Sequence, residues 1–574
     1  MTSIALTRLD NESNSSARRA ARSRVSWPAN LAPETIDYES RGHLLILGNE
    51  LDARRAAARL LPGLASITLL VTERSDAGES EMEDIELLWE TTSSLPNFTL
   101  DSASGLRLEG YLGRFTVTLP LESSGANLAR ASLSRDHFDL ILDLGTPPRL
   151  ALELLPPGYV AVRWGSPTFD STLEELPKLT GEFEKPRFFE VHHDLCAHDS
   201  RGRRGCTRCL DVCPADAIAS RQGRIEAWIE IDPYRCHGAG SCTSACPTGA
   251  IEYRLPHPVP LEQHVTALLA AYAEAGGRHP VVRFIDRQTL EREAGESAGH
   301  VLDVPLEEVG AAGLEQWLSA LADGAAEVRL QASDTLPESV SRLLDDQLAQ
   351  ARALLEALGH SSRFITWVPV HDAARRDALP HQPNLAPRDA RDDAGKTTAS
   401  DKRERLNTVI DRLAALGKPR EARQAMPLGA AFGGIEVATA GCTLCMSCVA
   451  VCPTSALGGG DDTTPSLTLC EADCVQCGLC QAACPEQVIQ LVPGFLPTPA
   501  RSERQVLKEE PAFECIRCAK PFATTSTIAA IKAKLADHPY FAGEAMMRLE
   551  MCEDCRVRDV WQELARNPEA QLKV

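Results

Sequence analysis

The residues of this chain with the clearest potential for chemistry are its cysteines, and they lie in three groups. Of the 20 cysteines, none falls in 1–195 or 247–441, and all lie within 196–246, 442–484 and 515–555. A disulfide scaffold would spread its cysteines more evenly, whereas metal-binding thiolates come from short loops with fixed spacing. The grouping therefore predicts metal sites in a protein whose thiols are kept reduced.

The second group repeats one motif. "CTLCMSCVAVCP" (442–453) and "CVQCGLCQAACP" (474–485) share the spacing Cys-x2-Cys-x2-Cys-x3-Cys-Pro, and in this they closely resemble two-cluster bacterial ferredoxins. In that family three cysteines of each motif hold one cubane and the fourth crosses to the other cluster. The resemblance implies two ligand sets: Cys442, Cys445, Cys448 and Cys484, and Cys474, Cys477, Cys480 and Cys452. A single zinc ion would need only half of these thiolates. Cys470 is left over, and we expect a buried bystander there.

The first group follows the same plan but departs from it twice. "CTRCLDVCP" (206–214) has Arg203 where the first cysteine of the motif belongs, and Cys196 lies ten residues before Cys206. The intervening "HDSRGRRG" is polar, as expected of an inserted loop. We expect Cys196 to supply the missing thiolate, although it could also be a free thiol. The predicted ligand set is Cys196, Cys206, Cys209 and Cys246.

The second departure is in "CHGAGSCTSACP" (236–247), where Ala239 replaces the second cysteine. The remaining ligands would be Cys236, Cys242 and the crossing Cys213. Ferredoxins that carry a [3Fe–4S] cluster typically lack cysteine at this position, so the resemblance suggests either that cluster or a [4Fe–4S] cluster with a labile, water-bound iron. The neighbouring His237 could also ligate. A dead site is less favoured, because the other ligands and the proline remain.

The third group consists of two CxxC pairs. "CIRCAKPF" (515–522) and "MCEDCR" (551–556) have the spacing typical of a tetrahedral zinc-ribbon site. The predicted ligands are Cys515, Cys518, Cys552 and Cys555. Zinc is the first choice of metal and rubredoxin-like iron the second.

Other elements must hold these loops. Residues 1–37 are predicted to be a disordered tail, and 38–180 a degenerate Rossmann-like α/β domain. Its strands are expected at 43–48, 66–73, 114–120 and 138–145, with a helix at 53–61. Only Gly48 stands at the first strand–helix turn, where a dinucleotide fingerprint has three glycines. Nucleotide binding is therefore weakly indicated, and a docking or scaffold domain is the alternative.

The remaining segments alternate with the cysteine groups. The prediction places a first ferredoxin-like module at 181–256, a small parallel α/β domain at 257–370 and a polar linker at 371–403. A second module follows at 404–495, beginning with a short helix near 404–416, and a metal-binding tail at 496–574. The expected fold class is α+β multidomain: two α/β domains interleaved with two dicluster modules and a zinc-ribbon-like tail.

Composition limits the partners. The net charge of −21 over 574 residues repels phosphate backbones, so nucleic acid is not expected as a partner, whereas a basic face on a redox protein would fit. No apolar run approaches the roughly 18–20 residues that span a bilayer. The basic "ARRAARSR" (17–24) is not followed by the apolar stretch of a signal peptide. We expect a cytoplasmic protein without a membrane span.

The order of these segments resembles a family of proteobacterial 4Fe–4S binding proteins that accompany molybdenum- or tungsten-dependent formate dehydrogenases. The resemblance is carried by "GEFEKPRFF" (181–189), "GCTRCLDVCP" (205–214), "CTLCMSCVAVCP" and "CIRCAKPF". It implies electron delivery to such an enzyme through three or four cubane-type clusters, or a role in the enzyme's maturation. No catalytic constellation is evident, so a carrier is favoured over a catalyst. A nucleotide- or flavin-using oxidoreductase is the less favoured alternative.

Overall fold

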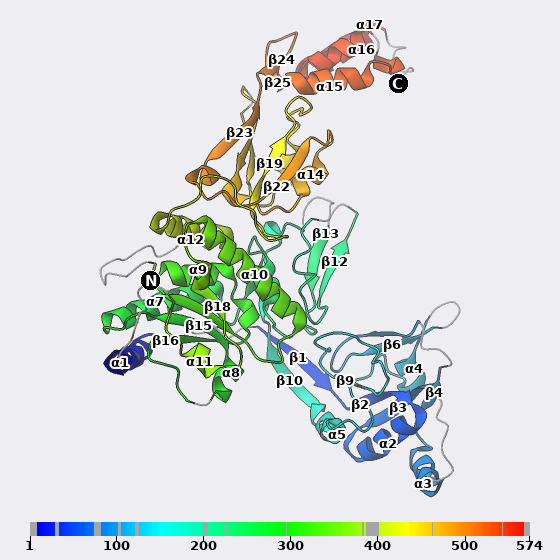
Figure 1. Cartoon of the computed structure of the whole chain (residues 1–574). Coiled ribbons are helices and arrows are strands. Elements are labelled where there is room, and N and C mark those ends of the chain that lie inside the picture. The colour runs from blue at the N-terminus through cyan, green and yellow to red at the C-terminus, as the bar shows by residue number, and fades with distance from the viewer. Residues whose placement is uncertain are drawn as a thin grey trace.

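The computed structural model is elongated, with the N-terminal α/β domain at one end and the cysteine-rich tail at the other (Figure 1). It describes residues 8–28, 34–73, 82–100, 105–120, 125–198, 205–224, 227–293, 295–381, 384–385, 401–461, 463–541 and 543–567. Within these residues no helix has the length and apolar character needed to cross a membrane.

The N-terminal domain is built on a five-stranded parallel sheet. Its strands, in spatial order, are β4 (Asn97–Thr99), β3 (Ser66–Glu73), β2 (His43–Asn49), β8 (Leu140–Asp143) and β9 (Tyr159–Ala161). The helices of this domain are α2 (Glu50–Leu60), α3 (Met82–Thr92), α4 (Leu128–Leu133) and α5 (Phe169–Glu175). The strand expected at 114–120 instead joins a separate antiparallel sheet of β5 (Arg107–Glu109), β6 (Thr116–Leu119) and β7 (Ala126–Asn127).

The predicted disordered tail is wrong for much of its length. Helix α1 (Arg8–Arg24) packs against α7 (Pro258–Glu274) of the central domain, next to each other in Figure 1. Ala17 and Ala21, one turn apart, are buried there, and the buried Arg18 donates to the carbonyl oxygen of Ala298 at 2.9 Å. The small side chains of Ala17 and Ala21 let α1 lie close to α7. The net basic charge of the segment does not indicate this packing.

Strand β1 (Thr35–Ser40), which begins within the same predicted tail, pairs antiparallel with β10 (Gly181–Pro186). This two-stranded ribbon joins the N-terminal domain to the first cysteine module (Figure 1).

The central domain contains a four-stranded parallel sheet. The strand order is β16 (Val301–Leu306), β15 (Val281–Asp286), β17 (Glu327–Gln331) and β18 (Ile365–Trp367). The associated helices are α7, α8 (Arg287–Arg292), α9 (Leu314–Ala322), α10 (Glu338–Ala357), α11 (Ala373–Arg376) and α12 (Lys402–Leu416). Leu406, Val409, Ile410 and Leu413 of α12 lie in the core of this domain. The helix expected near 404–416 thus packs with the central domain, although the prediction assigned it to the second module.

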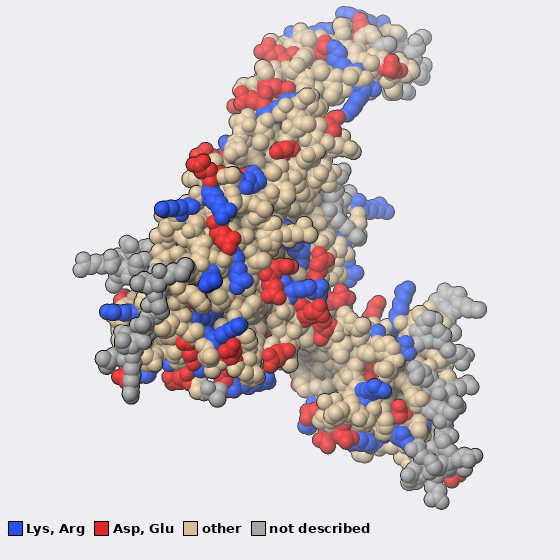
Figure 2. All heavy atoms as spheres, viewed as in Figure 1, with Lys and Arg blue, Asp and Glu red and all other residues tan. Residues whose placement is uncertain are grey.

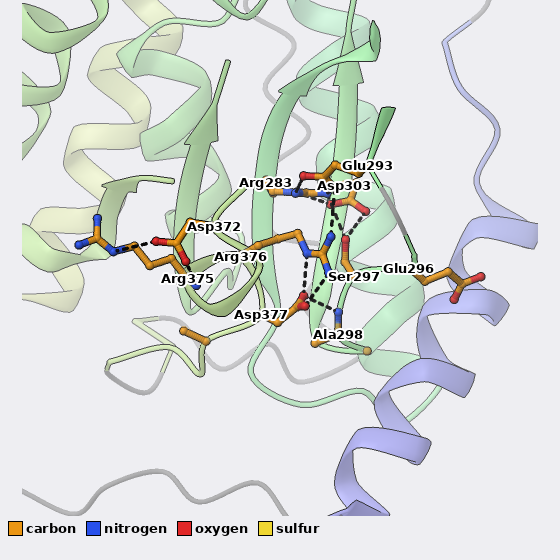
Figure 3. Close-up of polar contacts among 12 residues, drawn as sticks. Arg283, Glu293, Glu296, Ser297, Ala298, Asp303, Asp372, Arg375, Arg376 and Asp377 are labelled. Atoms are coloured by element: carbon orange, nitrogen blue, oxygen red, sulfur yellow. Dashed lines mark hydrogen bonds and ion pairs between the residues drawn. The ribbon is translucent and has the colours of Figure 1, made fainter. Parts of the chain in front are cut away.

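The first part of the predicted linker is also structured. Figure 3 shows Arg376 and Asp377 against the polar face of the central sheet. Arg376 pairs with Asp377 at 2.7 Å and with Glu293 at 3.4 Å, and Glu293 in turn pairs with the buried Arg283 at 2.9 Å. The charged side chains of this predicted linker therefore form ion pairs with charged groups buried at the sheet. Residues 386–400 lie outside the described residues.

Each cysteine module combines short strands with a short helix after a cysteine loop. The first contains β11 (Phe189–Val191) paired with β14 (Ile251–Tyr253), β12 (Ile218–Gln222) paired with β13 (Ala227–Ile231), and α6 (Ser241–Ala245). The second contains β19 (Gly433–Val437) paired with β22 (Ile489–Pro493), the strands β20 (Leu457–Gly459) and β21 (Ser466–Cys470), and the helices α13 (Ser447–Ala450) and α14 (Leu479–Ala483).

The C-terminal tail starts as an extension of the second module, because β23 (Arg504–Glu509) pairs antiparallel with β21. The predicted boundary at 495 therefore divides one sheet. Beyond it the tail contains β24 (Ala512–Glu514), β25 (Pro521–Thr524), α15 (Thr525–Leu535), α16 (Glu544–Met547) and α17 (Glu553–Arg566).

Candidate metal centres

Three of the cysteine loops share one backbone conformation. In both motifs of the second module, the second and fourth residues after the first cysteine are left-handed: Leu444 and Met446 (φ 53° and 59°), and Gln476 and Gly478 (φ 54° and 79°). The Ala239 loop has the same pattern, with φ of 79° at Gly238 and 72° at Gly240. A loop turned this way directs its side chains to one point, so replacement of the cysteine by alanine has left the loop's shape intact.

The four thiols predicted to form the first ligand set lie together. Cys196, Cys209 and Cys246 are buried in one core cluster, and Cys206 is half-buried. Burial raises the pKa of Cys209 well above its ordinary range, and the charges of Cys246, Cys206 and Cys196 raise it further. Because the four thiolates repel one another, their ionised form would be stabilised by a bound cation.

The ends of the inserted loop meet beside Cys206. The Cys206 N–H donates to the carbonyl oxygen of Ala197 at 3.3 Å, and Nδ1 of the buried His198 lies 2.8 Å from the carbonyl oxygen of Cys206. The other ring nitrogen of His198 lies 2.8 Å from Ser220 Oγ. His198 thus pins the loop, a role that sequence reasoning missed. Residues 199–204 lie outside the described residues.

The Ala239 loop lines an apolar cavity. Cys213, Cys236 and Cys242 face it together with Ala239 and His237. The space left at this site, about 30 Å³, is no smaller than the roughly 20 Å³ at the site of Cys442, Cys445, Cys448 and Cys484. A loop that had lost its cofactor would be expected to close over such a space, since protein interiors are tightly packed. The residues present therefore fit a bound cluster.

Two further residues define this site. Nε2 of His237 donates to the carbonyl oxygen of Leu155 at 2.8 Å, which leaves only Nδ1 for any ligation. Lys185 Nζ donates to the carbonyl oxygens of Tyr234 and Cys236 at 2.9 and 2.8 Å. Burial lowers the pKa of Lys185 to about 8, against the opposing charge of Cys236. This lysine lies in the quoted "GEFEKPRFF", but its position beside a cysteine loop was not predicted.

In the second module, the first predicted set surrounds a cavity lined by Cys442, Cys445, Cys448 and Cys484. Cys442 and Cys448 are buried, whereas Cys445 is exposed. Burial works to raise the pKa of Cys445, but the hydroxyl and N–H of Ser447 outweigh it and lower that pKa. Cys484 of the second motif thus lines the same cavity as three cysteines of the first motif.

The second predicted set of this module also comes together. Burial raises the pKa of Cys480 to about 12, and the charges of Cys477, Cys474 and Cys452 contribute to the rise. Nε2 of Gln476 lies 3.3 Å from Cys474 Sγ as a donor. Such N–H···S bonds stabilise the thiolate form that metal binding requires.

Cys470 does not join either set. It is buried on β21, and its Sγ lies 3.9 Å and 3.7 Å from the carbonyl oxygens of Arg501 and Ser502.

The tail cysteines form the tightest group. The Sγ atoms of Cys515, Cys518, Cys552 and Cys555 lie within 4.8 Å of one another, and those of Cys518 and Cys552 are 3.6 Å apart. Tetrahedral ligation at a Zn–S distance of about 2.3 Å puts sulfur atoms roughly 3.8 Å apart. Burial works against ionisation of Cys515, but the N–H groups of Cys552, Arg517 and Cys518 bring its pKa down to about 6. The geometry fits one metal ion.

The strand–helix turn after β2 does not favour a nucleotide. A Cβ on Gly48 would lie 2.9 Å from Leu144 Cβ, so the turn is already filled. The side chain of Asn49 caps α2, and Glu50 and Asp52 occupy the first turn of that helix. Carboxylates at a helix N-terminus satisfy the dipole that a phosphate would use.

Comparison with known proteins agrees with the geometry of both modules. The family model described as "4Fe-4S dicluster domain" matches residues 203–250 and 441–488. An uncharacterised ferredoxin of Methanocaldococcus jannaschii is 33% identical over 54 residues, which are 9% of this chain and 70% of that protein. These matches support an iron–sulfur electron-transfer role. Through its two dicluster domains, the chain belongs to the family of 4Fe–4S dicluster ferredoxins.

Proposed function

We propose that this protein accepts single electrons and passes them to a redox partner through four iron–sulfur sites. The observation that carries the proposal is the gathering of fifteen cysteines from two distant segments into four groups. Bound clusters would supply the one-electron chemistry, and the chain supplies thiolates, burial and hydrogen bonds that set their potentials.

The proposed ligand sets fall into three complete groups and one incomplete group. The complete groups are Cys196, Cys206, Cys209 and Cys246; Cys442, Cys445, Cys448 and Cys484; and Cys452, Cys474, Cys477 and Cys480. The incomplete group, Cys213, Cys236 and Cys242, is proposed to hold a [3Fe–4S] cluster. The open cavity and the retained turn at Ala239 support this choice over an empty site. The charge of Lys185 beside Cys236 would favour the reduced, more negative state there.

The tail is proposed to bind one structural zinc ion through Cys515, Cys518, Cys552 and Cys555. The close approach of the four sulfur atoms supports a single ion with no open coordination position.

The partner is proposed to be a metalloenzyme of the formate dehydrogenase type, on the strength of the resemblance in domain order. The exposed Cys445 is where an electron could leave or enter the chain. On the face shown in Figure 2, acidic and basic side chains alternate, and few charges lie around β19, β22 and α14. A docking partner would then be recognised through shape and apolar contact as much as through charge.

A second candidate function, assembly of such a metalloenzyme, is favoured by the surface of the tail. Several large apolar side chains are exposed there, among them Ile516 (52%), Tyr540 (53%), Val557 (51%) and Trp561 (67%). Exposed apolar surface of this extent is typical of protein-binding sites. Pull-downs with the immobilised chain separate the two functions: an assembly factor retains partner enzyme that lacks its metal cofactor, and an electron carrier retains the mature enzyme.

The proposed function is tested by anaerobic purification, with iron, sulfide and zinc counted per chain and EPR spectra recorded before and after dithionite. We expect iron for three four-iron clusters and one three-iron cluster, one zinc ion, and a three-iron signal in the protein as isolated. Absence of any reducible cluster signal would overturn the electron-transfer proposal. Iron for three cubanes alone, without the three-iron signal, would overturn the assignment at Ala239.

A further inference from the structure

The two dicluster modules meet at Cys206 and Cys477. A Cβ on Gly205 would lie 3.0 Å from the Cγ atom of Leu479, the second residue after Cys477. Arg208 donates from Nη1 to the carbonyl oxygen of Val475 at 3.4 Å. The cysteine loops of the two modules are therefore in direct contact, although they are more than 200 residues apart in the sequence.

The first residues of α12 form hydrogen bonds to both modules at this contact. Lys402 donates from Nζ to the carbonyl oxygens of Thr243 and Ser244, at 2.9 and 3.1 Å, in the helix that ends at Cys246. The next residue, Arg403, donates from Nη2 to the carbonyl oxygen of Cys474 at 2.9 Å and from Nε to that of Ala472 at 2.7 Å. Both side chains are buried. Lys402 thus binds the first module, and Arg403 binds the second.

The two cations differ in how they are compensated. Lys402 forms an ion pair with Glu315 at 3.0 Å. In Arg403, the atoms Nε, Nη1 and Nη2 each donate to a carbonyl oxygen. The acceptor of Nη1 is the carbonyl oxygen of Ala431, at 3.0 Å. A guanidinium that bonds to neutral acceptors keeps its charge acting on its surroundings. The site of Cys474 therefore has a buried positive charge beside it.

We propose that Lys402 and Arg403 hold the two modules together, so that two redox centres are adjacent: the site of Cys196, Cys206, Cys209 and Cys246 and the site of Cys452, Cys474, Cys477 and Cys480. In addition, Arg403 raises the reduction potential of the site that contains Cys474. This rests on the proposed function. A transfer across the contact oxidises one site by one electron and reduces the other, and no bond or proton is exchanged. The outside electron source and sink are the reductant and the redox partner. Arg403 acts as a positioning and tuning residue.

The first test compares the full-length protein with Arg403→Gln, Arg403→Lys and Arg412→Gln in redox titrations followed by EPR. Arg412 lies on the same helix but contacts Asp323 at 2.7 Å and the carbonyl oxygen of Ala322 at 2.9 Å, both in the central domain. In Arg403→Gln we expect one cluster to bind its electron about tenfold less tightly, a midpoint lower by about 59 mV. Arg403→Lys should recover most of the difference, and Arg412→Gln should match the parent.

The second test uses a double variant, Cys242→Ser with Cys448→Ser, which removes one ligand from each outer site. The two intact sites that remain lie in different modules. We expect dithionite to produce an EPR spectrum split by spin–spin interaction between them. Two unsplit signals in protein that contains iron for both sites would overturn the adjacency, whether or not the Arg403 variants fold.

These outcomes separate this inference from the proposed function. If the parent protein shows no reducible clusters, the electron-transfer proposal fails first. If the parent has its clusters but Arg403→Gln leaves every midpoint unchanged while retaining its iron, only the tuning role is overturned.

Discussion

Cys206 and Cys445 occupy the same motif position in the two modules, as the second ligand of the first set, yet their surroundings differ. Cys206 is half-buried and lies beside the loop of the second module, whereas Cys445 is exposed. The modules are thus stacked head to tail. The face by which the first module contacts the second corresponds, in the second, to the face on which the tail packs, where Thr524 and Thr527 donate to the carbonyl oxygen of Thr443 while Cys445 stays exposed. Identical spacing in sequence therefore specifies the ligands but not which cluster is terminal.

The same comparison accounts for the place of Ala239. Its counterpart in the second module is Cys477, whose loop contacts the loop of Cys206. In the first module, the turn Val309–Ala311 of the central domain covers the Ala239 position, where the second module has a neighbouring cysteine loop. The approach is close, since a Cβ on Gly310 would lie 2.5 Å from the carbonyl oxygen of Ala239. The incomplete site lies at the end of the stack that the central domain covers, and the exposed cysteine lies at the end next to the tail.

Exchanging the residues at the equivalent positions gives the largest expected effect. Ala239→Cys should convert the proposed three-iron site to a four-iron site, and Cys477→Ala should do the reverse in the second module, because this ligand binds the removable iron. Iron content and the EPR signal of the oxidised protein measure both changes. An Ala239→Cys protein that still lacks the fourth iron would contradict the equivalence of the two positions. Cys470→Ala is the control, and it should leave the iron content unchanged.

Removing a ligand of the metal proposed for the tail should have the next largest effect, and it tests how the tail differs from the modules. The core cluster at this site consists of Cys515, Met551 and Cys552, with Phe522 and Cys555 packed against it. So small a core cannot hold three helices without metal ligation. We expect Cys552→Ser to make residues 512–567 sensitive to limited proteolysis.

In the same Cys552→Ser protein, the EPR signals of both modules should remain. Loss of all cluster signals would show that the tail is part of the cluster-binding fold. A tail that resisted protease as well as the parent would show that metal is not what holds it.

The difference in exposure between Cys445 and Cys206 should appear in their reactivity. During brief exposure of the loaded protein to oxygen, we expect oxidation at Cys445 at least about tenfold faster than at Cys206, since susceptibility follows accessibility. Peptide mass spectrometry after quenching measures both. Equal rates would mean that the contact between the modules opens in solution. Cys518, exposed in the tail, is the internal reference.

The smallest expected effect concerns the anchoring of α12, on which the stacking depends. Burial raises the pKa of Glu262 to about 7, against the opposing charge of Arg405, 3.3 Å away on α12. The folded state then binds a proton that the unfolded chain, with a carboxyl pKa near 4.5, releases. Stability should therefore fall by about 3 kcal/mol as pH rises from below 4.5 through 7.

Glu262→Gln should flatten this dependence, as measured by denaturant unfolding of the cluster-loaded protein at pH 5 and pH 8. The same slope in the variant would assign the dependence to other groups. Glu503→Gln, at a carboxyl on the surface of the tail, should keep the parent's slope.

Much of the fold could be predicted from periodicity, because strands such as 43–49 contain an unbroken apolar run, here 44–47. The errors came where polar side chains are buried. Arg18 in the predicted tail and Arg376 in the predicted linker both lie in partly or fully buried charge networks. Lys402 and Arg403 were likewise assigned to a linker. Charged residues are read as solvated unless their partners, distant in sequence, are known.

The amino-acid sequence alone specifies which thiols are available, because the spacing of cysteines within a short loop limits which sulfur atoms can converge. It also shows that alanine stands at position 239, where the motif has cysteine. The contact of the Cys206 loop with the second module and the exposure of Cys445 could be found only from the folded chain. It alone decided that α12 stands between two cysteine loops. The physical reason is range: ligand spacing is local, whereas stacking depends on contacts between segments separated by more than 150 residues.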